Sequence, residues 1–141
     1  MSHVMELITL QTLDDEAAAL RAALADVERQ LRGDDDLVTA RRELTTASQA
    51  LEESQRNQRR VEMEIATLTA KIVPEEKRLY DGSVRNPKEL GAIQHELELL
   101  KPARAKYEDE LLETMTRGEV HDRERGRAHH AVEQLEARWQ T

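Results

Sequence analysis

The side chains best able to do chemistry in this sequence are its five histidines and 29 carboxylates, because it contains no cysteine. His129 and Glu133 stand four residues apart, so a helix would place them on one face, where such a pair can supply two metal ligands. A metal site needs three or four converging ligands, and nothing nearby completes this pair. We therefore favour a solvated helix face and expect no metal site and no cofactor.

Catalytic patterns are missing from the sequence as well. It has no glycine-rich phosphate loop and no Ser/His/Asp arrangement. The long helices argued below would also provide no concave pocket to exclude water from a reaction. We expect no catalytic residues and predict that the protein is not an enzyme.

Basic residues form two groups that a nucleic acid might use. The first group is Arg41, Arg42, Arg56, Arg59 and Arg60, and the second is Lys77, Arg78, Arg85 and Lys88. The net charge of −8 opposes a nonspecific grip on phosphates, and no aromatic residues interleave to stack on bases. A mixed-charge, solvated surface is the favoured interpretation, with nucleic-acid binding as the alternative.

Tyr80 and Arg85 flank a turn and belong to the residue types that anchor protein interfaces. Lys88 lies at the start of the following helix, where its charge opposes the helix dipole, so backbone geometry does not explain its presence. We predict a partner-binding tip made of Tyr80, Arg85, Lys88 and Glu89. The competing interpretation is that Tyr80 plugs the end of the hydrophobic core.

The composition indicates long helices. Aromatic residues make up 2% of the chain and charged residues 35%, which suits a thin aliphatic seam between wet helix faces. No apolar run approaches the roughly 20 residues that span a membrane, and the N-terminus lacks the features of a signal peptide. We expect an all-α cytoplasmic protein.

Apolar residues recur at heptad spacing in two phases before residue 81. Residues 1–32 form an N-terminal helix, with seam positions Leu10, Leu13, Ala17, Leu20, Leu24, Val27 and Leu31. The seam resumes one residue out of phase at Leu37 and continues to Leu79, which defines a first arm over 37–80. Gly33 and the three aspartates after it predict a break or kink over 33–36.

The chain is predicted to reverse over residues 81–86, with a tip between two antiparallel arms. Gly82 suits a left-handed helix cap. Asn86 and Pro87 then start a second arm over 87–140, with Glu89 placed to close a capping box. The seam residues of this arm are Leu90, Ile93, Leu97, Leu100, Tyr107, Leu111, Met115, Val132, Leu135 and Trp139. We therefore predict one domain over 1–141, a long antiparallel coiled-coil hairpin.

The tip carries residues that resemble a known family. These are the runs Arg78-Leu79-Tyr80-Asp81-Gly82, Asn86-Pro87-Lys88-Glu89-Leu90, His95-Glu96-Leu97 with Leu100-Lys101, and Glu108 to Glu113 with Met115. They are similar to those of the bacterial coiled-coil proteins that end in a C4-type zinc ribbon. The specific likeness covers about residues 65–117.

The resemblance implies an antiparallel hairpin followed by a ribbon built on two Cys-x-x-Cys pairs. It also implies binding of the nitrogen- and flagellar-type alternative sigma factor, with links to flagellar or type III secretion and, in one lineage, to messenger RNA. This sequence has no cysteine, so zinc is expected only in a ribbon that the chain lacks. Metal binding and RNA contact through a ribbon are not carried over.

Arm lengths predict that the N-terminal helix is left without a partner. If the reversal centres near Val84, Thr141 would face Val27 and about 25 preceding residues would be uncovered, because both helices rise equally per residue. Three arrangements fit: the second helix was cut short before a ribbon, the first segment folds back at Gly33, or two chains pair as a homodimer. The sequence leaves these alternatives open.

These observations favour a non-enzymatic adaptor or chaperone-like module that docks a transcription or secretion factor through its tip. The alternatives are a nucleic-acid-associated regulator and a structural spacer. Steep salt dependence of binding would distinguish a nucleic-acid partner from a protein partner.

Overall fold

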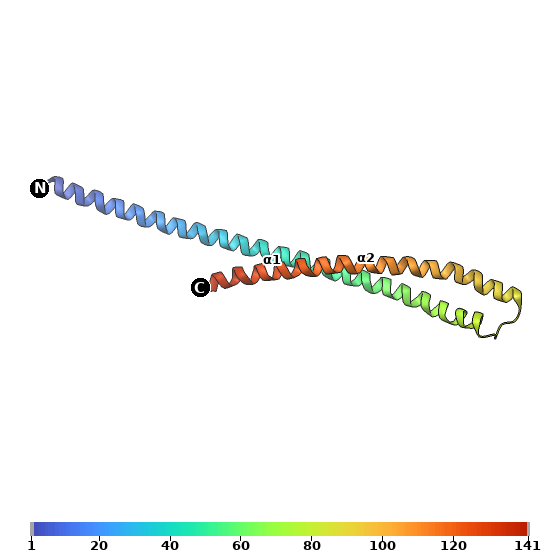
Figure 1. Cartoon of the computed structure of the whole chain (residues 1–141). Helices are drawn as coiled ribbons and strands as arrows, with labels where there is room; N and C mark the ends of the chain where they lie inside the picture. The colour runs from blue at the N-terminus through green and yellow to red at the C-terminus, as the bar shows by residue number, and fades with distance from the viewer. Residues whose placement is uncertain (1, 141) are drawn as a thin grey trace. The chain divides into compact units, whose positions relative to one another are not determined.

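The computed structural model describes residues 2–140, which form two helices. Helix α1 spans Ser2–Tyr80 and helix α2 spans Pro87–Gln140, and a loop of residues 81–86 joins them (Figure 1). The two helices pack together as an antiparallel coiled-coil hairpin, and no strand occurs in the part of the chain that is described. The all-α hairpin predicted from the sequence is confirmed, and its tip lies at the predicted residues. Neither helix, over the described residues, has a stretch long and apolar enough to cross a membrane.

The sequence predicted a break or a kink over residues 33–36. Helix α1 runs without interruption through these residues, so a break there is wrong, while a kink within the continuous helix stays a prediction. Within the described residues, the predicted N-terminal helix, from Ser2 to residue 32, and the predicted first arm over 37–80 are parts of one element; Met1 lies outside the described residues. A single glycine costs about 1 kcal/mol of helix propensity. Asp34, Asp35 and Asp36 are all exposed, so water screens their mutual repulsion. Strong helix formers on both sides outweigh these costs.

The chain divides into two compact units. One contains residues up to Leu44 together with those from Ala128 onward, and the other, Thr45–Arg127, contains the tip. Each unit includes a segment of both helices. We describe the tip unit first.

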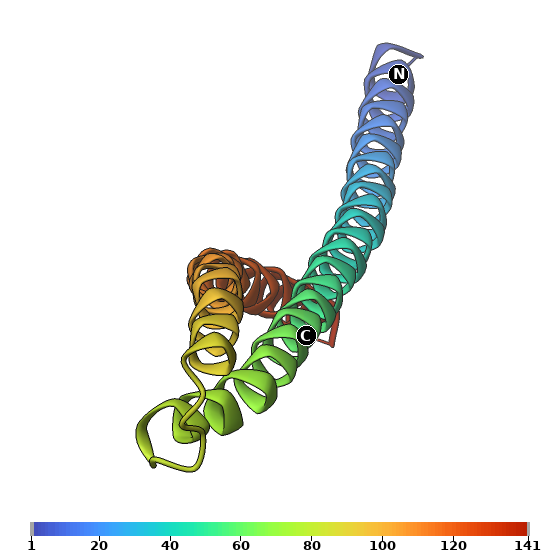
Figure 2. The same ribbon diagram turned by 90° about the vertical axis from the view of Figure 1, so that its right-hand side faces the viewer.

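The core of the tip unit is aliphatic, as the composition requires. Ile72, Ile93 and Leu97 are buried together, and Leu68, Leu79, Val84 and Leu100 pack against them. The loop crosses from the end of α1 to the start of α2 (Figure 2). Because Val84 of this loop packs against the cluster, the loop itself closes the end of the core. This packing explains how a short loop keeps a defined conformation between two long helices.

Farther from the loop, the core of the same unit includes a buried polar residue. Val61 is buried, and Thr114 is its buried counterpart on α2 with only 2% of its surface exposed. The Thr114 hydroxyl donates a hydrogen bond of 2.8 Å to the carbonyl of Glu110, which satisfies the buried polar group. Met115, predicted as a seam residue, is 42% exposed. The α2 seam therefore passes through Thr114 instead of Met115.

In the other unit, Ala40 and Val132 are buried and Arg41 forms an ion pair with Glu136 at 3.2 Å. The ring of Trp139 lies directly against Gly33. The arm-length argument had placed the end of α2 beside Val27, so the observed register differs by about one helical turn. Thr141, used in that argument, lies outside the described residues. Because α1 is continuous, its N-terminal segment does not fold back at Gly33.

Candidate protein-binding site at the hairpin tip

The loop begins with a turn held by Asp81. Its backbone N–H donates to the carbonyl of Lys77 at 2.9 Å, which completes the last turn of α1. Its carboxylate then accepts a hydrogen bond of 2.9 Å from the backbone N–H of Ser83. Between Asp81 and Ser83, Gly82 has a φ of 76°, a left-handed conformation that other residues adopt only with strain. The glycine is therefore required by the direction in which the chain leaves α1.

Hydrogen bonds from the Ser83 hydroxyl and from the Ser83 backbone N–H hold the pKa of Asp81 below its usual value of 3.8. Because the folded loop favours the ionised carboxylate, its stabilising effect is present above the unfolded pKa and is lost as pH falls through the lowered pKa. The side chain is exposed, so the effect is local to the turn.

The start of α2 is capped by Asn86. Its side-chain oxygen accepts from the backbone N–H of Lys88 at 2.9 Å, and its carbonyl accepts from Leu90 at 3.0 Å. Pro87 occupies the first helical position, where its missing N–H costs nothing. Asn86 caps the N–H of Lys88 and not that of Glu89, and Glu89 makes no hydrogen bond to Asn86, so the predicted capping box does not form. Both ends of the loop are thus fixed by short local bonds.

The side chains predicted to bind a partner all lie on the surface of this structured tip. Tyr80 is 79% exposed, which excludes the alternative that it plugs the core. Arg85, Lys88 and Glu89 are also exposed, on the loop and the first turn of α2. Core closure is provided by Val84 and Leu79 instead.

A shallow hollow of about 500 Å³ lies beside Tyr80 within the tip unit. Its lining residues are Leu79, Tyr80, Gln94, Leu97, Glu98, Lys101 and Pro102. Sequence reasoning did not identify this surface. The available signal was the spacing of Gln94, Glu98 and Lys101, which places them on one helix face next to the seam residue Leu97.

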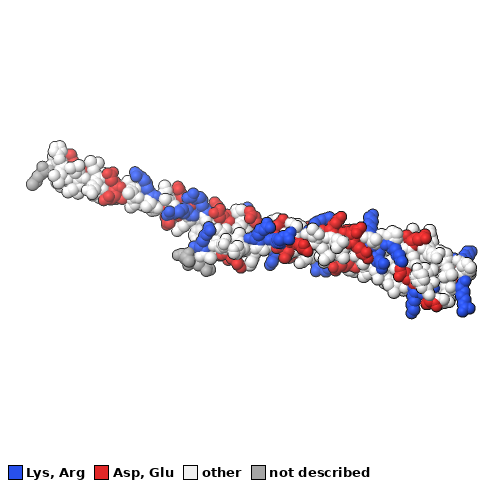
Figure 3. Space-filling model, in the orientation of Figure 1, with Lys and Arg blue, Asp and Glu red and all other residues white. Residues whose placement is uncertain are grey.

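The charges near the tip are only partly paired. Arg78 forms an ion pair with Glu75 at 3.2 Å, and Lys101 forms one with Glu76. In the described part of the chain, Lys77, Arg85 and Lys88 make no ion pair. Figure 3 shows lysine and arginine side chains projecting from the end of the molecule that carries the loop. The tip therefore offers cationic groups close to an exposed tyrosine.

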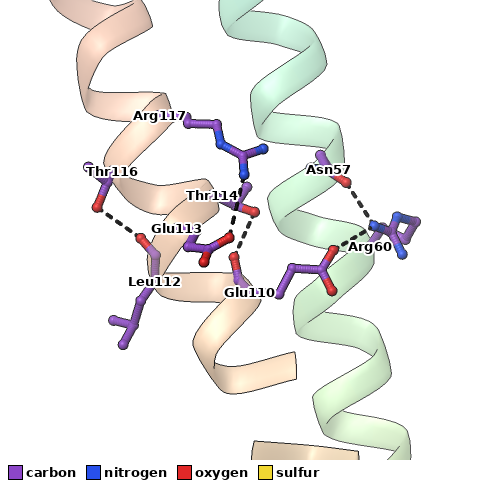
Figure 4. A network of polar contacts seen from close by, with 8 residues as sticks. All are labelled: Asn57, Arg60, Glu110, Leu112, Glu113, Thr114, Thr116 and Arg117. Carbon is purple, nitrogen blue, oxygen red and sulfur yellow. Dashed lines mark hydrogen bonds and ion pairs between the residues drawn. The ribbon is translucent and has the colours of Figure 1, made fainter. Parts of the chain in front are cut away.

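The basic group on the first arm is interrupted by carboxylates. Arg60 contacts Glu110 of α2 at 3.2 Å and Asn57 at 2.9 Å (Figure 4). On α2, Arg117 pairs with Glu113 at 3.5 Å in the same region. An open groove of about 630 Å³ here is lined by Glu53 as well as by arginines. The arrangement is a mixed-charge surface and not a continuous basic strip.

His129 and Glu133 lie on one face of α2, with 2.7 Å between Nε2 and the carboxylate. Both side chains are more than half exposed. Over the described residues, no group of three or more potential ligands gathers to hold a metal ion. The pair is a surface contact whose strength depends on protonation of the histidine.

Two long helices, an aliphatic seam and a capped loop define a coiled-coil hairpin. Residues 10–141 match the family of CT398-like coiled coil hairpin domains, and the chain belongs to this family. No curated protein and no solved structure matches the chain. The family match covers the hairpin, a fold typical of structural or interaction modules.

Proposed function

We propose that this protein is a non-enzymatic, adaptor-like module that binds a protein partner through the tip of its hairpin. The observation that supports this most directly is Tyr80, which is 79% exposed at the rim of a hollow. The hollow is lined by both apolar and polar side chains. Exposed tyrosines are typical anchors of protein interfaces, because the ring contributes a large contact area at low entropic cost.

Packing alone does not account for Tyr80. The hydrophobic core at this end of the hairpin is closed by Leu79, Val84 and Leu97. A smaller or more polar residue at position 80 would leave that core intact. The exposed ring is therefore available to a partner.

The charges indicate what the partner surface contains. Arg85 and Lys88 are cationic and have no carboxylate partner in the described chain, whereas the charge of Lys77 acts on the nearby Asp81 carboxylate. A matching surface would present carboxylates around a small apolar patch that receives the Tyr80 ring. The resemblance makes the nitrogen- and flagellar-type alternative sigma factor the first candidate, followed by a secretion component.

The proposal is tested with the full-length chain and the purified alternative sigma factor of the same bacterium. We expect the double variant Tyr80→Ala/Arg85→Ala to weaken binding by roughly 30-fold or more, because removing one interface anchor costs about 2 kcal/mol. Helicity measured by circular dichroism should stay unchanged, because neither side chain belongs to the core. The matched control is Arg59→Ala/Leu112→Ala, which removes an exposed arginine and an exposed apolar residue from the arms.

Equal binding by the tip variant and the wild type would place the interface on the arms. A loss of helicity in step with the loss of binding would mean that Tyr80 and Arg85 serve folding. Binding of a single-stranded RNA probe that falls steeply between 50 and 200 mM salt would favour the nucleic-acid alternative. Failure to bind any of these probes would favour a structural spacer.

A further inference from the structure

The N-terminal part of α1 carries a continuous apolar row on its surface. The large side chains at its seam positions, Leu10, Leu13, Leu20, Leu24, Val27 and Leu31, are between 49% and 72% exposed. Single exposed leucines are common, but a row repeated over three heptads is the pattern that packs against another helix. A partner helix is therefore needed to bury this surface.

This row is not an extension of the surface that contacts α2. In residues 33–44, the positions turned toward α2 are Gly33, Leu37, Ala40 and Leu44. Continued toward the N-terminus at the same spacing, those positions become Gln30, Asp26, Ala23 and Ala19. The leucine row stands one residue away, a rotation of roughly 100° around the helix. A helix that followed the α2 side of α1 would meet small and polar residues instead of leucines.

The leucine row also remains open where α2 is present. Val38 continues the row of Leu24 and Leu31 and is 47% exposed. Gly33, which precedes Val38 in sequence, contacts α2, and Ala40, which follows it, is buried. A second helix can therefore lie along Leu31 and Val38 without displacing α2.

We propose that the occupant of this surface is a second copy of the chain, in a parallel two-stranded coiled coil over residues 10–38. Leu10, Ala17, Leu24, Leu31 and Val38 would form one set of layers, and Leu13, Leu20, Val27 and Asp34 the other. At 1.5 Å per residue, this seam is about 40 Å long. The inference does not depend on the tip or on what the tip binds.

Charges beside the seam match a parallel arrangement. Leu10, Ala17, Leu24 and Leu31 occupy heptad position a. In a parallel coiled coil, the residue directly before each position a lies near the residue five places later in sequence on the other helix. This places Glu16 of one copy next to Arg21 of the other, and the two-fold symmetry creates the contact twice. Neither residue forms an ion pair within the described chain. The remaining neighbours, Thr9, Ala23 and Gln30, are uncharged, so no like charges meet at these flanking positions. Asp34 is the one charged residue on a seam position between Leu10 and Val38, and it would face its own copy at the end of the seam.

The absence of native cysteine makes the orientation directly measurable with the full-length chain. In a parallel dimer, Leu13→Cys faces its own copy and should form a disulfide-linked dimer under mild oxidation. In an antiparallel dimer that keeps the leucine row paired, position 13 would instead face position 31. A covalent dimer from an equal mixture of Leu13→Cys and Leu31→Cys, with none from Leu13→Cys alone, would overturn the parallel arrangement.

Charge reversal tests the same geometry without a cross-link. Glu16→Arg and Arg21→Glu should each weaken self-association several-fold in analytical ultracentrifugation, and mixing the two variants should restore it. Leu20→Lys should yield a monomer, whereas Ala22→Lys, on the opposite face of the helix, should leave the dimer unchanged. Circular dichroism of each variant checks that the hairpin remains folded. A wild-type chain that stays monomeric at high concentration, or a dimer that survives Leu20→Lys, would refute the proposal.

Discussion

At the scale of single residues, Gly33 shows that one residue can weaken a helix and yet be required for its packing. Glycine lowers helix propensity, and its position before three aspartates suggested a break. In the folded chain Gly33 is helical, and the Trp139 ring occupies the space where a Cβ would be. The residue is therefore needed for close packing, at a small cost to the helix.

Two helical glycines give opposite expectations for substitution by alanine. Gly91→Ala should stabilise the protein by about 0.5–1 kcal/mol, because alanine favours helix and no atom lies near the new Cβ. Gly33→Ala should lose this gain because its Cβ overlaps the ring of Trp139. Denaturant unfolding measures both effects. The emission of the single tryptophan should shift to the red only in Gly33→Ala, and an unshifted emission would show that the ring is not packed on Gly33.

At the scale of elements, the hairpin depends on one aliphatic cluster next to its loop. Ile72, Ile93 and Leu97 join α1 to α2, and Val84 adds the loop to the same cluster. The Asp81 turn and the Asn86 cap direct the chain, but their hydrogen bonds are exposed and individually weak. Burial of the cluster is thus the main source of stability at this end.

Truncation of one member of this cluster should separate packing from helix propensity. Ile72→Ala should lower the free energy of unfolding by about 2–5 kcal/mol, because the side chain is fully buried. Val73→Ala, at the adjacent position where the side chain is 55% exposed, should cost far less. Chemical denaturation of both variants provides the comparison. Similar losses would mean that the hairpin is stabilised by helix propensity and not by the seam.

The elements could be predicted from the sequence wherever one local signal dominated. Heptad spacing from Leu37 to Leu79 identified the seam of the first arm, and Asn86-Pro87 located the start of α2. The sequence signals did not predict correctly which residue is buried where the two helices meet. Sequence patterns favoured Met115 over Thr114 because a buried threonine is acceptable only when its hydroxyl finds a carbonyl, as it does at Glu110.

The tip site was predictable in part for the same reason. Tyr80 and Arg85 were identified by residue type and by their position at a turn. The hollow beside Tyr80 combines α1 residues with Gln94, Glu98 and Lys101 of α2, and its formation depends on the register between the helices. That register differed by about one turn from the value expected from arm lengths. A surface made by two helices cannot be located more precisely than their register.

At the scale of the whole molecule, stability differs along the chain. The two units each have their own internal contacts, as expected for long helices that contact only what lies beside them. Over residues 2–32, α1 has no second helix in the described chain to bury its leucine row. An isolated helix is only marginally stable in water, so this segment should depend on association.

Hydrogen exchange should therefore reveal two behaviours in one chain. Amides around Ile72 and Leu97 should be protected equally at all concentrations, because the hairpin supplies their packing within one molecule. Amides between Leu10 and Leu31 should exchange quickly in dilute solution and become protected as the concentration rises, because dimerisation buries their seam. Leu20→Lys should abolish this concentration dependence and leave the tip unaffected, whereas Ala22→Lys should preserve it. Strong protection of residues 10–31 in the Leu20→Lys variant would show that the N-terminal helix is stable by itself, and that its leucine row is not required to hold it together.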